Sequence, residues 1–170
     1  MNMKGQYFSF DAIIATVIMV LAFSSLVAYW NGAQSLVESR TYGRLADANR
    51  IAESLLSPGS PTDWDGKSIS DIRQIGIATG FGNELNNSKV EKLSEQANSN
   101  YKEVGNLLRA GGDYFILIER TNTAAGETEI IAEIGNKDYD LVDAKYVAVA
   151  NRGATLDGRP VRMRVFLWKE

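Results

Sequence analysis

The sequence of 170 residues contains no cysteine and no histidine. Without cysteine the chain has no disulfide, no thiolate nucleophile and no zinc–thiolate site. Without histidine it lacks the commonest general base and metal ligand of proteins. The 18 lysine and arginine residues are dispersed and the net charge is −3, so the basic stripe typical of nucleic-acid binding is missing too. These absences argue against an enzyme and a nucleic-acid partner, and we predict no catalytic, cofactor-binding or metal-binding residues.

What the sequence does contain is one long apolar run near its N-terminus. No charged residue occurs between Ala12 and Val37, and the 19 residues 12–30 are almost all aliphatic or aromatic. About 20 such residues are what an α-helix needs to cross a bilayer. Tyr29 and Trp30 close the run, and such amphipathic rings favour the membrane interface. The run therefore predicts a helix of membrane-spanning length.

Three kinds of segment fit this run. A cleaved secretory signal has a charged first part, a shorter apolar part and a small-x-small cleavage site, for which residues 22–24 are the candidate. A simple membrane anchor fits the length but gives no reason for Asp11, because a carboxylate that enters lipid is costly and usually has a partner. Asp11 also suits the positive end of its own helix, in which case it is only a helix-start residue. The third kind of segment accounts for the residues before the run as well.

The residues in front of the run carry a pattern of their own, in which Lys4-Gly5-Gln6 is followed by Ser9 and Asp11. This arrangement resembles the class III signal peptide of archaeal type IV pilin-like proteins. In that family a short leader ends in Lys/Arg-Gly, and an acidic residue follows within the apolar helix. The resemblance covers about the first 30 residues and predicts cleavage between Gly5 and Gln6. The serine and the acid stand one position later than in the common family pattern, so cleavage after Gln6 is the alternative.

The resemblance implies a structural role. The chain would be a subunit of an archaeal type IV pilus-like filament at the cell surface, made from a membrane-inserted precursor by prepilin peptidase and the pilus assembly platform. Its main partners would be copies of itself in a helical homo-oligomer, with Asp11 setting the register by pairing with the new α-amino group of a neighbour. The residues predicted to form the transmembrane segment and then the filament core are Phe8, Ile13, Ile14, Val17, Ile18, Val20, Leu21, Phe23, Leu26, Val27 and Trp30.

The predicted helix continues beyond the apolar run. Apolar or small residues recur three or four apart from Ala33 to Leu55, and most charged residues lie off that stripe. Pro58 and the glycine and serine residues around it stop the helix. We therefore divide the chain into a leader (1–5), a long helix (6–57) and a globular domain (58–170). The helix has a membrane or filament-core half (6–31) and an amphipathic half (32–57).

The globular domain is predicted to contain two short helices and then strands. Trp64 stands among polar turn residues, so its ring is expected to fold back onto the core. Ser88 and Ser99 are the predicted N-caps of the helices, and the second helix is expected to end at Gly111-Gly112. Residues 113–168 alternate apolar and polar side chains in about four strands, with a hairpin turn at 157–158. The predicted fold class is α+β: a long N-terminal hydrophobic helix followed by a small antiparallel β-sheet, the plan of pilin-like proteins.

Two loops carry weaker predictions. Asn86-Asn87-Ser88 is the only N-glycosylation sequon of the sequence, which makes Asn86 a candidate glycan acceptor. Asp138, Asp140 and Asp143 are spaced like calcium ligands, but the loop lacks the glycine and the closing glutamate of the calcium-binding pattern. We therefore favour a solvated turn there and predict no metal.

Arg159, Arg162 and Arg164 form a small basic group near the C-terminus. They fit either a solvent-facing row that discourages edge pairing of the sheet or a contact with an acidic patch of another subunit. The alternative to a filament subunit as a whole is a single-pass membrane-anchored extracellular binding domain that does not polymerise. The two functions differ in whether the N-terminus is cleaved and the helix buried against copies of itself.

Overall fold

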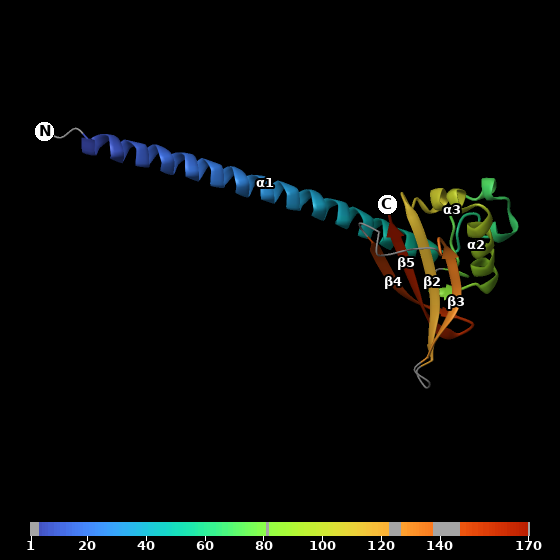
Figure 1. The fold of residues 1–170 in the computed structure, drawn as a ribbon. Coiled ribbons are helices and arrows are strands. Elements are labelled where there is room, and N and C mark those ends of the chain that lie inside the picture. The colour runs from blue at the N-terminus through green and yellow to red at the C-terminus, as the bar shows by residue number, and fades with distance from the viewer. Residues whose placement is uncertain (1–3, 81, 123–126, 138–146, 170) are drawn as a thin grey trace. The chain divides into compact units, whose positions relative to one another are not determined.

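The computed structural model describes residues 4–80, 82–122, 127–137 and 147–169 (Figure 1). The chain divides into two compact units, Met1–Arg40 and Thr41–Glu170. We call the second unit the head. Helix α1 (Lys4–Leu55) supplies the described part of the first unit and the first element of the head.

Helix α1 is uninterrupted, as the composition predicts. The sequence has no proline before Pro58, and alanine and leucine, the best helix formers among apolar residues, are frequent in it. Gly32 and Gly43 lie inside the helix without breaking it, although each costs about 1 kcal/mol relative to alanine. The helix ends at Leu55, within the last turn before the predicted stop.

The described residues of the head form a five-stranded mixed sheet in the order β1-β4-β5-β2-β3. The strands are β1 (Glu84–Leu85), β2 (Asp113–Asn122), β3 (Glu127–Gly135), β4 (Ala148–Leu156) and β5 (Arg159–Trp168). β2 to β5 pair antiparallel as predicted, but β1 runs parallel to β4. The prediction of a purely antiparallel sheet is wrong because a strand of two residues has no alternation that could reveal it.

Strands β4 and β5 form the hairpin that the sequence predicts. Asp157 and Gly158 connect them, and both have positive φ angles of 53° and 70°. Such angles define the type I′ turn, whose twist matches that of the flanking strands. The resulting register turns alternate residues of β5 into the core, where they are at most 5 % exposed: Val161, Met163, Val165 and Leu167.

The core of the head lies between the sheet and three helical segments, namely the last turns of α1, α2 (Asn87–Ser99) and α3 (Tyr101–Leu108). The buried α1 residues recur at helical spacing, which confirms the last part of the predicted stripe: Ala48, Ile51, Ala52 and Leu55. Leu45 and Ala33 of that stripe are exposed. Helices α2 and α3 bury Val90, Leu93, Val104 and Leu108 in this core, and Leu107 is partly buried. The last turns of α1, from Ala48 to Leu55, are thus part of the globular core.

The predicted N-cap of α2 is wrong. The cap is Asn86 and not Ser88, because the Asn86 side-chain oxygen accepts a hydrogen bond from the backbone N–H of Lys89 at 3.2 Å. Asparagine and serine cap equally well, and the choice between neighbours depends on which backbone is extended before the first turn. Asn86 has the extended backbone, with φ −100° and ψ 120°.

Both predicted ends of α3 are also displaced. The helix is preceded by Asn100 rather than Ser99, with no side-chain cap. It ends at Leu108, three residues before Gly111, because Arg109 already takes the left-handed conformation with φ 54°. An arginine at that position was not foreseeable from sequence, since glycine is the usual residue there.

Trp64 packs into the core as predicted and is 1 % exposed. It lies in a 3₁₀ turn (Trp64–Gly66), and its indole N–H donates a hydrogen bond of 2.7 Å to the backbone oxygen of Gly76. Gly76 itself is held against the end of the α1 segment, because a Cβ atom there would lie 2.2 Å from the backbone oxygen of Ser57. The ring and the glycine together fix the long loop between α1 and β1 onto the core.

Candidate functional site

The most unusual surface of the chain is the N-terminal part of α1. Phe10–Ser35 contains a window of 18 residues with a mean hydropathy of 2.3, none of which is buried, so the segment is long and apolar enough to cross a membrane. All large apolar side chains described between Phe10 and Trp30 are 44–76 % exposed. They include every residue predicted to form the filament core except Phe8. The structure does not describe the side chains of Phe8, Lys4 and Gln6.

This surface is apolar on every side of the helix. A side chain of valine, leucine, isoleucine or phenylalanine gains about 1.5–3 kcal/mol when it is fully removed from water. Thirteen large apolar side chains are exposed between Phe10 and Trp30. Water is therefore an unfavourable environment for the segment by an amount on the order of 20 kcal/mol. Lipid or the apolar helices of other copies would remove that cost.

Hydroxyl groups inside the segment bond to its own backbone. The Thr16 hydroxyl donates to the oxygen of Ala12 and the Ser25 hydroxyl to the oxygen of Leu21, each at 2.8 Å. Such bonds to the preceding turn let a hydroxyl enter an apolar environment without an unsatisfied donor. These two polar side chains therefore do not oppose burial of the helix.

Asp11 is the exception within the segment. It is the only charged residue of Phe10–Ser35, its side chain is exposed, and in the described part of the chain it makes no hydrogen bond or ion pair. It lies beyond the first turn of α1, which begins at Lys4 and has no acidic residue. The helix dipole acts mainly within the first turn, so the dipole of the full-length helix does not account for this carboxylate.

The candidate glycan acceptor, Asn86, lies at the start of α2 and is half-buried. Its side-chain oxygen is used by the cap described above, and glycosylation there stays a prediction. Asp138, Asp140 and Asp143 lie outside the described residues. Among the residues that were described, no cluster of three acidic side chains could hold a metal ion.

The structure contradicts one of the two roles predicted for the basic group Arg159, Arg162 and Arg164, and the other, a contact with another subunit, stays a prediction. β5 lies in the interior of the sheet, so Arg162 and Arg164 cannot guard an edge. Both arginines pair with Glu119 of β2, which is 3 % exposed, and the Arg164 contact measures 2.7 Å. Burial alone would raise the pKa of Glu119, but hydrogen bonds from Arg164 and Arg162 outweigh it and hold that pKa below its usual value. Sequence reasoning missed Glu119, because its partners are more than 40 residues away.

Comparison with protein-family models and with curated proteins finds no match to this chain.

Proposed function

We propose that this chain is a structural subunit of an archaeal type IV pilus-like surface filament. The precursor is held in the membrane by Phe10–Ser35, trimmed by a prepilin peptidase after Gly5 and assembled through the apolar part of α1. The observation that carries this proposal is an apolar helix surface, exposed on all sides, with one carboxylate that has no partner in the described part of the chain. A plain membrane anchor has no use for that carboxylate.

The proposed cleavage gives Asp11 a partner. It creates an α-amino group at Gln6 with a pKa near 8, which is a cation at neutral pH. In a bundle of staggered helices that cation lies next to Asp11 of a neighbouring copy, where the low dielectric constant strengthens their attraction. A buried carboxylate that misses its partner costs about 3–5 kcal/mol. The pair therefore favours one axial stagger over all others, while the apolar side chains supply contact area in any register.

The experiment is to replace Asp11 with alanine in an archaeal host that has a prepilin peptidase. The matched control is Thr16→Ala. It removes a hydroxyl group of the same helix that bonds only to the backbone of that helix. We expect both variants to insert in the membrane and to be cleaved. Electron microscopy of sheared surface material should show filaments from the Thr16 variant and none from the Asp11 variant.

Normal filaments from the Asp11 variant would remove the role of the carboxylate. An uncleaved, unpolymerised wild-type protein would instead support the membrane-anchored binding domain. These outcomes separate the register mechanism from the filament itself.

A further inference from the structure

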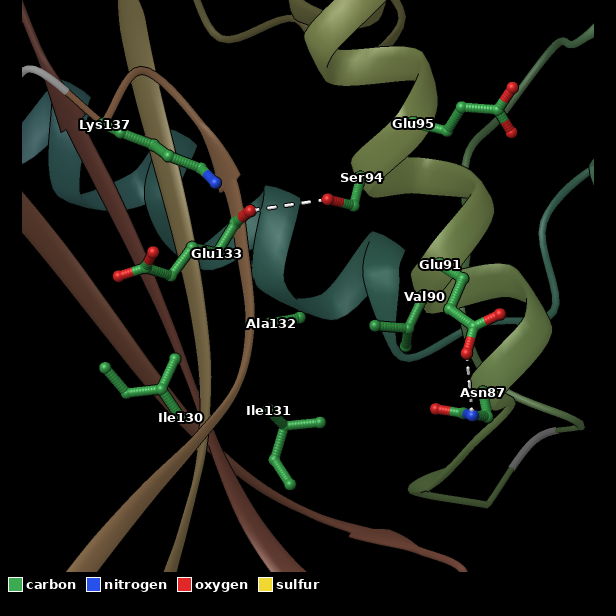
Figure 2. Close-up of a pocket in the computed structure, with 10 residues that line it drawn as sticks. All are labelled: Asn87, Val90, Glu91, Ser94, Glu95, Ile130, Ile131, Ala132, Glu133 and Lys137. Atoms are coloured by element: carbon green, nitrogen blue, oxygen red, sulfur yellow. Dashed lines mark hydrogen bonds between the residues drawn. The ribbon is translucent and has the colours of Figure 1, made fainter.

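A groove of about 410 Å³ lies between α2 and β3 of the head (Figure 2). We call it the acidic groove, because the charged residues that line it are Glu91, Glu95, Glu133 and Lys137. Glu95 is already paired with Lys92 of the same helix at 2.8 Å, so Glu91 and Glu133 are the carboxylates that give the groove its negative charge. In the described part of the chain the Glu133 carboxylate has no partner, so its charge is available to a ligand.

A second cavity of about 410 Å³ is lined by the last turns of α1, the loop residues Arg73 and Gln74 and the end of α3. We call it the basic cavity, because the charged residues that line it are Arg50, Glu53, Arg73 and Arg109. Three guanidinium groups against one carboxylate leave a net charge of +2. The acidic groove and the basic cavity share no residue, and no ion pair among the described residues joins them.

One arginine of the basic cavity is fixed and two are free. Arg50 donates to the backbone oxygens of Leu108 and Arg109, at 3.1 and 2.8 Å, so it holds α1 against the end of α3. Arg73 and Arg109 have exposed side chains that make no ion pair or hydrogen bond in the described part of the chain. Glu53, the one carboxylate, is already bound to Arg152 at 2.7 Å.

The backbone of Arg109 gives a second, independent sign that its side chain is used. Its φ of 54° lies in the left-handed region, which is unfavourable for a residue with a Cβ atom. Glycine would take this helix-terminating position without that cost. Non-glycine residues held in such conformations cluster at functional sites. A charged side chain that points into a cavity from this position fits such a site.

We infer that the basic cavity of one copy receives the acidic groove of the next copy. The inference rests on the proposed filament, in which all neighbours are identical chains. A contact between two different patches is heterologous, and heterologous contacts repeat into open helical arrays instead of closing into dimers. Because the two patches come from different elements of the head, each copy can use both at once. The contact would join the heads in the same assembly that the α1 segments hold together.

Thiol crosslinking of intact filaments tests this inference, since the natural chain has no cysteine to react. One variant carries both Glu91→Cys and Arg109→Cys, and two others carry one change each. We expect a short bismaleimide to join the double variant into a ladder of oligomers. Mixed filaments of the two single variants should give crosslinked dimers, and each single variant alone should give none. A double variant with Glu103→Cys and Lys169→Cys, which lie outside both patches, is the control and should stay uncrosslinked.

Charge reversal provides the second arm. Arg73→Glu with Arg109→Glu should lower filament yield at least about tenfold at low salt, because like charges would then face each other across the contact. Adding Glu91→Arg and Glu133→Arg to the same chain should restore the yield. Intact filaments without the ladder, or crosslinked dimers from one single variant alone, would overturn this contact and leave the filament proposal standing. A wild-type chain that forms no filament overturns both.

Discussion

Replacing Glu119 with glutamine removes one charge from the outer face of the sheet and leaves Arg162 and Arg164 side by side. Two charge-assisted hydrogen bonds are lost, each worth about 1.5–3 kcal/mol when fully buried. The carboxylate is buried, but the guanidinium groups are 53 % and 32 % exposed, so water recovers part of the loss. We therefore expect the free energy of unfolding of the head to fall by about 2 kcal/mol.

Urea unfolding of the full chain in detergent measures this change. Trp64 and Trp168 report on the head because they are 1 % and 5 % exposed, whereas Trp30 lies on the apolar segment outside it. The matched control is Glu129→Gln. The Glu129 side chain is 65 % exposed, and its Oε2 atom lies 3.5 Å from Nη1 of Arg120. Removing this charge should lower the free energy of unfolding by at most about 0.5 kcal/mol.

The effect of Glu119→Gln should also depend on pH. The pKa of Glu119 in the folded head lies below its usual value. The ionised carboxylate therefore stabilises the head fully above about pH 4.5, and this stabilisation is lost as the pH falls through the folded-state pKa. The difference between wild type and variant should therefore shrink in acid. A difference that is the same at pH 7 and pH 3, or is below about 0.5 kcal/mol at pH 7, would refute the argument from the buried charge.

Three further changes test the head. Gly76→Ala should destabilise it by at least about 2 kcal/mol, because the new Cβ meets backbone, whereas Gly66→Ala, with open space around it, should be nearly neutral in the same urea assay. Trp64→Phe should cost about 1–3 kcal/mol, because it leaves a buried carbonyl without its donor. Asn86→Ala should cost about 1 kcal/mol through the lost cap, whereas Ser88→Ala removes the sequon and keeps the cap. A mass loss in the Ser88 variant would confirm a glycan, and equal masses apart from the substitution would exclude one.

Some of this fold could be predicted because the relevant interactions are local. The type I′ turn at 157–158 needs two adjacent residues that accept positive φ, and aspartate followed by glycine meets that need. The inward side of β5 follows from strict alternation, and the apolar run of α1 follows from composition alone. In each case the physical cause lies within a few residues of the feature.

The features that could not be predicted depend on partners distant in sequence. Nothing near Glu119 indicates that two arginines of β5 will neutralise it, since strand order decides which residues become neighbours. Strand β1 pairs parallel with β4 through two residues, too few for any pattern. The basic cavity brings Arg50 together with Arg109 across 59 positions. Only tertiary structure creates that cluster, although each arginine is visible in the sequence.

The mass of the mature chain in surface filaments tests the central claim most directly. Sheared filaments are collected, dissociated and analysed by intact and N-terminal mass spectrometry. The account predicts a chain that begins at Gln6, with cleavage after Gln6 as the one acceptable variation, and that is recovered as a polymer. A chain that retains Met1 and is recovered only from the membrane would contradict it.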